Sequence, residues 1–233
     1  MNGVQNKIPG LTGNQLKLLA LAAMTCDHVG VQLMDLLPLR IVGRLAFPVF
    51  AYMISEGCAH TRSRGRYLGT MAALALAMQA VYFAVMGSLV QSVLTAFSMS
   101  IALVYLLDWA LEKRTTGAIG AAVLAVAGAF FLCEVLPGLL PGTDYSVEYS
   151  FFGVLLPVLV YFGKGKGQKL ALFTLGLTAV NFYYGGVQWF ALAAVPLLAL
   201  YNGQWGKWRM KYLFYIYYPA HLVIIWFLSL LFA

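Results

Sequence analysis

Residues 117–136 have the sequence GAIGAAVLAVAGAFFLCEVL, in which Glu134 is the single charged side chain. An α-helix rises ~1.5 Å per residue, so a helix of this length spans the ~30 Å hydrocarbon core of a bilayer. The basic pair Lys113 and Arg114 lies shortly before the run, as is typical of the end of a membrane span. The stretch therefore predicts a transmembrane helix.

Similar apolar runs lie on both sides of this stretch along the 233 residues of the chain. Hydrophobic residues make up 62% of the sequence and charged residues 10%, whereas soluble domains carry roughly 25% charged residues. We therefore predict an all-α, polytopic bundle of about nine transmembrane helices. Residues 1–14 would form a short cytoplasmic segment and residues 15–233 a single membrane domain. The other predicted helices cover residues 15–37, 41–59, 67–88, 93–111, 149–163, 169–184, 186–201 and 210–232.

The basic residues are distributed in a way that predicts the orientation of the chain. If the N-terminus is cytoplasmic, nine spans place 13 of the 15 basic residues inside, and only Arg40 and Arg44 toward the outside. The outer loop 134–150 then holds three acidic residues and no basic one. This pattern predicts an N-in, C-out protein of the bacterial inner membrane, and it explains the net charge of +7 without a nucleic-acid partner. The inner residues are Lys7, Lys17, Arg62, Arg64, Arg66, Lys113, Arg114, Lys164, Lys166, Lys169, Lys207, Arg209 and Lys211.

The first predicted helix, 15–37, carries a stripe of polar side chains. Ionisable residues inside a membrane span are costly and usually mark function. His28 follows Lys17 by eleven residues, so its imidazole lies ~16 Å further along the same face. The stripe should run the height of the membrane and line a cavity or the bundle interior, whereas Asp27 points about 100° away, toward a different partner. Its members are Lys17, Thr25, His28, Gln32 and Asp35.

Two other helices carry polar groups at depth. In the predicted helix 41–59, Arg44 lies toward the outer side, Glu56 near the inner edge, and Pro48 should kink the helix. In the last helix, His221 lies ten residues beyond Lys211, ~15 Å deep, so the two histidines could meet in one site. Each histidine could instead bond a neighbouring carbonyl, and Arg44 could reach the outer interface.

Cysteine usage and ligand spacing point away from disulfide and metal chemistry. Cys26, Cys58 and Cys133 all lie in or beside apolar runs, and an odd number of cysteines cannot pair completely. We interpret them as small packing residues. No metal-ligand set stands out, so we expect no metal cofactor.

Several segments resemble the TraX family, small multi-pass membrane proteins named for acetylation of the N-terminus of conjugative pilin. The Gly-Arg-Leu-Ala-Phe-Pro segment at 43–48 and the Tyr-Pro-Ala-His-Leu segment at 218–222 are specific when found in this order. The resemblance runs from about residue 15 to residue 228. The other segments that resemble the family are Leu16-Lys17, Met24 to His28, Glu56-Gly57, Thr61, Arg66-Tyr67, Thr143 to Tyr145, Gly153, Tyr161, Tyr201 to Gly203 and Lys211-Tyr212.

The resemblance implies a membrane acyltransferase that moves an acetyl or other acyl group from cytoplasmic acyl-CoA. Many such enzymes place a basic residue eleven positions before a catalytic histidine, as Lys17 and His28 are placed here. The expected acceptor is a peptide amine or a hydroxyl of a surface glycan or lipid, and the carboxylates of loop 134–150 could hold an amine. The expected catalytic residues are His28, Asp27, Arg44 and His221. The CoA-binding residues would be Lys17, Arg62, Arg64 and Arg66, although the three arginines could serve topology alone, and substrate contacts would come from Gln32, Glu56, Tyr145 and Tyr218.

Two other functions fit the same composition. Intramembrane Asp and His residues also suit a proton-coupled transporter or exporter, although no inverted repeat is evident. A non-catalytic assembly factor for a surface appendage is the third possibility. Turnover of the thioester by purified protein separates the acyltransferase from both.

Overall fold

A computed structural model of the chain describes residues 9–206 and 211–232. Lys7, Lys207 and Arg209, which belong to the predicted inner charge set, lie outside the described residues. The described residues form helices, with two isolated bridges, Leu11 to Tyr201 and Gln91 to Val147, in place of any strand. Two compact units divide the chain, residues 1–50 with 190–233 and residues 51–189.

The first unit is built around helix α1 (Gly13–Gln32), which packs against α2 (Leu37–Gly43) and α11 (Lys211–Phe232). Thr12 and Gln15 form a reciprocal capping box that starts α1. The backbone of Leu11 donates to the carbonyl of Leu200 at 2.8 Å, just after the short helix α10 (Ala194–Ala199). The start of α1 is thereby fixed to a segment nearly two hundred residues away in the chain.

Two glycines allow α1 and α2 to pack closely. A Cβ atom on Gly43 would lie 2.3 Å from the Cβ of Asp27, and one on Gly30 would lie 2.8 Å from the Cβ of Leu39. Real Cβ atoms do not approach this closely, so a larger residue at Gly43 would push the helices apart. Gly43 therefore sets the distance at which Asp27 meets its neighbours on α2.

The structure corrects two predicted helices. Helix α1 ends at Gln32 rather than at residue 37, and Asp35 lies in the following loop with a left-handed backbone (φ 44°). The predicted helix 41–59 is two helices, α2 and α3 (Ala46–His60), and the break lies at Arg44 and Leu45 rather than at Pro48. Pro48 has no N–H to donate to the Arg44 carbonyl, so it fits the first turn of a new helix.

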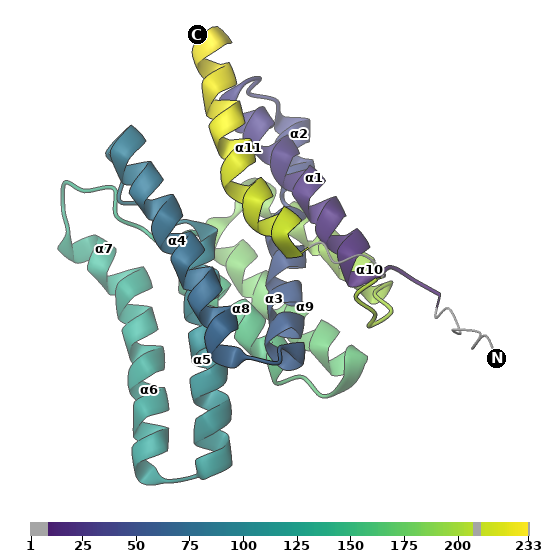
Figure 1. Cartoon of the computed structure of the whole chain (residues 1–233), viewed down its shortest axis with the longest axis vertical. Coiled ribbons are helices and arrows are strands. Elements are labelled where there is room, and N and C mark those ends of the chain that lie inside the picture. Colours follow the sequence, from purple (N-terminus) through teal and green to yellow (C-terminus); the bar gives the residue numbers. More distant parts are fainter. Residues whose placement is uncertain (1–8, 207–210, 233) are drawn as a thin grey trace. The chain divides into compact units, whose positions relative to one another are not determined.

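The second unit contains α4 (Arg64–Met86), α5 (Val93–Lys113), α6 (Thr116–Phe130), α8 (Ser150–Tyr161) and α9 (Gly165–Tyr184). Helix α5 is its centre and packs against α4, α6 and α8, while α8 packs against α9. Figure 1 shows α5 and α6 as an antiparallel pair joined by a tight turn. A π-helical turn η1 (Phe131–Val135) and α7 (Leu136–Leu139) extend α6, and the 3₁₀ segment η2 (Gly186–Ala193) leads back to the first unit.

Four helical segments of the described chain are long and apolar enough to cross a membrane. They are Leu37–His60, Arg64–Met86, Val93–Lys113 and Thr116–Leu139, of 21 to 24 residues. Large apolar side chains such as Leu76, Leu124 and Phe182 are more than 70% exposed. Their exposure would be unfavourable in water but not in contact with lipid chains. The chain is therefore an all-helical membrane protein with transmembrane helices.

Candidate functional site

An ion pair joins α1 to the end of α2. The guanidinium of Arg44 donates to the Oδ1 carboxylate atom of Asp27, and its Nε donates to the Arg40 carbonyl at 3.2 Å. The two side chains are 16% and 20% exposed. Asp27 thus has a partner separate from that of His28, as its direction on the helix predicted. Arg44 pairs with this carboxylate inside the first unit, which the alternative of a side chain extended only to the outer membrane interface did not include.

The two histidines of the first and last helices lie side by side. The ring centroids of His28 and His221 are 5.1 Å apart, with their planes tilted by 60°. His221 is 4% exposed, and its Nδ1 donates to the Tyr217 carbonyl at 2.9 Å. In the neutral ring, Nε2 then carries the lone pair. That atom is buried and has no hydrogen-bond partner within the described residues, so it is available to accept a proton.

Tyrosines surround this histidine pair on the α11 side. The ring of Tyr217 stacks on His221 at 5.3 Å, and that of Tyr218 meets it nearly edge-on at 5.7 Å. The Tyr217 hydroxyl donates to Thr25 Oγ1 at 2.6 Å, because the Thr25 hydroxyl is already donated to the Leu21 carbonyl. Sequence reasoning did not single out Tyr217. Its position one helical turn before His221 was the available signal.

The remaining members of the predicted stripe lie elsewhere. The ammonium of Lys17 lies 4.8 Å from the centre of the Trp205 ring, a cation–π contact that the sequence did not predict. Gln32 is exposed at the end of α1, and Asp35 lies beyond the helix. The predicted polar stripe thus keeps its first four members on α1, and only its extension to Asp35 was wrong, because the helix ends at Gln32.

The predicted residues of the second unit have partners of their own. Buried Glu56 pairs with the ammonium of Lys169, and Arg64 pairs with Asp108 at 2.5 Å. Arg62 and Arg66 are exposed at the start of α4. The Tyr145 hydroxyl donates to the Leu132 carbonyl at 3.3 Å. These predicted CoA-binding and substrate-binding residues thus lie in the second unit, whereas the histidine pair lies in the first.

The three carboxylates of loop 134–150 bind backbone N–H groups. Glu134 accepts from the Phe151 N–H at 2.9 Å and Glu148 from the Val93 N–H at 2.8 Å, so each caps the start of a helix. Asp144 accepts from the Ser88 hydroxyl at 2.6 Å and the Leu89 N–H at 2.9 Å. These two donors hold the pKa of Asp144 below its usual 3.8. The expected role of the loop in holding an amine stays a prediction.

Among the described residues, no group of three or more His, Cys, Asp or Glu side chains is placed to hold a metal ion. The family described as "TraX protein" matches residues 12–229, nearly the whole chain. The chain belongs to the TraX family. The chain is also 25% identical over 237 residues to a probable fimbrial assembly protein FimC, serogroup H1, of Dichelobacter nodosus. That match covers 91% of this chain and 93% of the relative. No solved structure matches the chain.

Proposed function

We propose that this member of the TraX family is an acyl-CoA-dependent acyltransferase of the inner membrane. It would move an acetyl or other acyl group to an amine or hydroxyl acceptor, such as a pilin N-terminus or a cell-surface molecule. The observation that carries the proposal is the contact between the rings of His28 and His221, in which the buried Nε2 atom of His221 has no hydrogen-bond partner among the described residues. Membership of the TraX family supports the choice of reaction.

His28 is the proposed general base. It takes the proton from the acceptor N–H or O–H group as the nitrogen or oxygen of that group attacks the thioester carbonyl carbon. The carbon–sulfur bond breaks, and the CoA thiolate leaves with the proton that His28 carries. Neutral imidazole suits the step because its ordinary pKa lies near the working pH.

His221 fits a different part of the same reaction. Its Nδ1–H is already donated to Tyr217, so the neutral ring has no N–H left for an oxyanion. It can accept a hydrogen bond or a proton through Nε2, which suits a partner that orients His28 or shares its proton. Tyr218, whose ring meets His221, and Arg44, which pairs with Asp27, are the proposed groups that stabilise the thioester oxyanion.

The CoA donor would bind at the cytoplasmic mouth through its phosphates. Lys17 and the basic cluster of Arg62, Arg64 and Arg66 supply the positive charge for charge-assisted hydrogen bonds. All three arginines are exposed, and Arg64 also pairs with Asp108. Gln32, Glu56 and Tyr145 remain proposed acceptor contacts.

The proposed topology has nine spans, a cytoplasmic N-terminus and an external C-terminus. It adds α1, α8, α9, the η2–α10 segment and α11 to the four long apolar spans. The asymmetric distribution of Lys and Arg supports it. It brings the cytoplasmic donor and an external acceptor to opposite ends of one membrane domain.

A second candidate is a non-catalytic assembly factor for a pilus or fimbria. The name of the Dichelobacter nodosus relative favours this function without stating a reaction. Assembly of the pilus or fimbria would then require this protein but no thioester chemistry.

The test uses purified protein, acetyl-CoA labelled in the acetyl group, and an extract of the membrane fraction. We expect release of free CoA and transfer of label to a component that mass spectrometry can identify. Protein that binds pilin or surface components but releases no CoA would support the assembly factor instead.

A further inference from the structure

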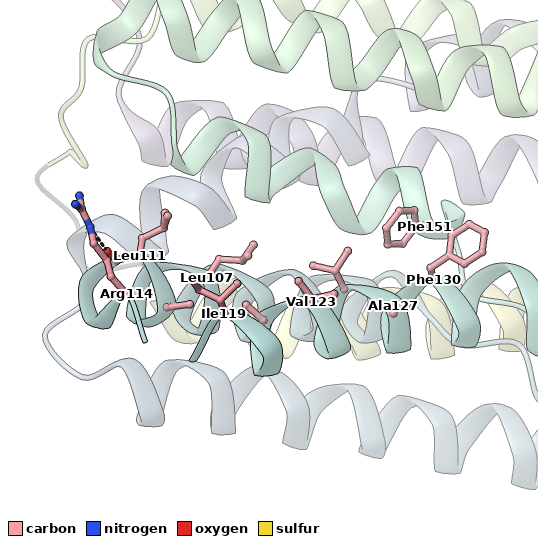
Figure 2. A pocket seen from close by; sticks show the side chains of 11 residues that line it. Leu107, Leu111, Arg114, Ile119, Val123, Ala127, Phe130 and Phe151 are labelled. Carbon is pink, nitrogen blue, oxygen red and sulfur yellow. Dashed lines mark hydrogen bonds between the residues drawn. The ribbon is translucent and has the colours of Figure 1, made fainter. Parts of the chain in front are cut away.

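An apolar groove of about 650 Å³ lies along α5 and α6 in the second unit. This volume falls within the ~300–1,000 Å³ of typical ligand sites. Figure 2 shows Arg114 at one end of the row of lining side chains, and Phe130 and Phe151 at the other. Those two aromatic rings meet edge to face at 5.3 Å and close that end. The groove has no part in the reaction proposed above.

The length of the groove matches one leaflet of a bilayer. From Ile119 to Phe130, α6 advances eleven residues, which is ~16 Å and about half of a ~30 Å hydrocarbon core. Ala110 and Ala122 also line the groove, and their side chains are single methyl groups that fill little of it. Val123 lies on the rim and is 62% exposed. A single extended acyl chain fits a groove of this length with an apolar lining.

The charge of the groove is confined to one end. Arg114 is the one charged residue that lines it, and its Nε donates to the Leu111 carbonyl at 3.3 Å, which holds the guanidinium at the end of α5. Lys113 precedes it, and α6 begins at Thr116 with its positive helix end. Glu112 offsets one of the two positive charges. An anion at this end would therefore meet a net positive environment.

We propose that the groove binds an anionic phospholipid, with one acyl chain along α6 and the phosphate at Arg114. A protein helix could also cover an apolar groove. The single charged end and the one-leaflet depth favour a lipid, because a lipid carries its charge at one end of one leaflet. Basic pockets between transmembrane helices commonly bind such headgroups. Binding of a lipid in this groove would be independent of acyl transfer.

The headgroup is tested by native mass spectrometry of the purified full chain, titrated with phosphatidylglycerol and phosphatidylcholine of identical chains. We expect preferential retention of phosphatidylglycerol. Arg114→Gln should weaken that preference about fivefold, since one basic residue near an anionic headgroup contributes about that much. Lys164→Gln, a change at an exposed basic residue outside the groove, is the matched control and should keep it. Equal retention of the two lipids by the unaltered protein would overturn the proposal.

The acyl chain is tested by filling the groove. Val123→Trp places an indole on its rim, while Leu124→Trp places the same group on the neighbouring residue, which is 74% exposed and does not line the groove. We expect Val123→Trp to lose the retained phosphatidylglycerol and Leu124→Trp to keep it. Ala127→Trp, at another lining residue, repeats the test if Val123→Trp is not monodisperse. Equal lipid retention in the filled and control variants, or a protein dimer that only the filled variants lose, would contradict a lipid occupant.

Discussion

At the scale of single residues, Asp27 and its neighbour His28 make separate contacts. Asp27 directs its carboxylate to Arg44 on the neighbouring helix, and Gly43 provides the close approach that this requires. His28, the next residue, turns toward His221 on α11. Adjacent positions of one helix thus serve two different contacts, and substitutions at the two should have different effects.

We expect Asp27→Asn to lower stability more than catalysis. Removing one partner of a buried ion pair costs about 3–5 kcal/mol, and the partial exposure of both side chains reduces our estimate to ~1–3 kcal/mol. Thermal denaturation in detergent measures this loss. The double variant Asp27→Asn with Arg44→Met should lose less than the sum of the single changes. A stable but inactive Asp27→Asn protein would instead place Asp27 in the chemistry.

At the scale of elements, the segments before α5 and α8 are joined to each other. The backbone of Gln91 donates to the Ser146 carbonyl at 2.7 Å, and that of Glu148 donates to the Gln91 carbonyl at 3.0 Å. Asp144 adds bonds to Ser88 and Leu89. The acidic loop therefore fixes the starts of two helices, a role that its distribution of charge did not reveal.

This loop should contribute to stability in a pH-dependent way. The pKa of Asp144 is lowered by folding, so its contribution is present above its unfolded pKa and is lost as the pH falls through the folded value. Between about pH 5 and pH 3, Asp144→Asn should show a smaller fall in melting temperature than the unaltered protein. Ser88→Ala should act in the same direction. As a control we suggest Glu112→Gln, an exposed carboxylate far along α5. Identical pH profiles for the Asp144 variant and the unaltered protein would refute this role.

Helix positions were largely predictable from the sequence, and the contacts between helices were not. The apolar runs near 67–88, 93–111 and 117–136 correspond to α4, α5 and α6 with its extension. Their ends were predictable because charged or turn-forming residues separate each run from the next. The break at Arg44 differed because Pro48 acts on the carbonyl four residues earlier. The contact of Lys17 with Trp205 and the cap from Glu148 to Val93 join distant segments, and no local pattern records such contacts.

At the scale of the whole molecule, the proposed mechanism depends on the topology of the chain. A cytoplasmic donor and an external acceptor require both faces of the membrane. The described residues include four long apolar spans, and the proposed nine-span arrangement also needs α1, α8, α9, the η2–α10 segment and α11 to cross. The charge asymmetry is the physical argument for that arrangement.

Reporter fusions test the topology. A fusion of alkaline phosphatase to the C-terminus should be active, and a cytoplasmic reporter at the same point should not be. Fusions within the 113–116 turn should give the opposite pattern, because the proposed topology places its basic residues on the cytoplasmic side. A C-terminus that reports as cytoplasmic would exclude an odd number of spans with a cytoplasmic N-terminus.

The most direct test of acyl transfer at the histidine pair is the initial rate of His28→Ala with acetyl-CoA and a matched acceptor. Loss of a general base typically costs ~10²–10⁴-fold in rate, and His28→Gln should be nearly as slow because an amide cannot take the proton. His60→Ala is the matched control, since that half-exposed histidine lies in the other unit. Monodispersity in detergent verifies folding. The account predicts a rate lost in the His28 variants and kept in His60→Ala, whereas a well-folded His28→Ala protein with a near-normal rate would contradict it.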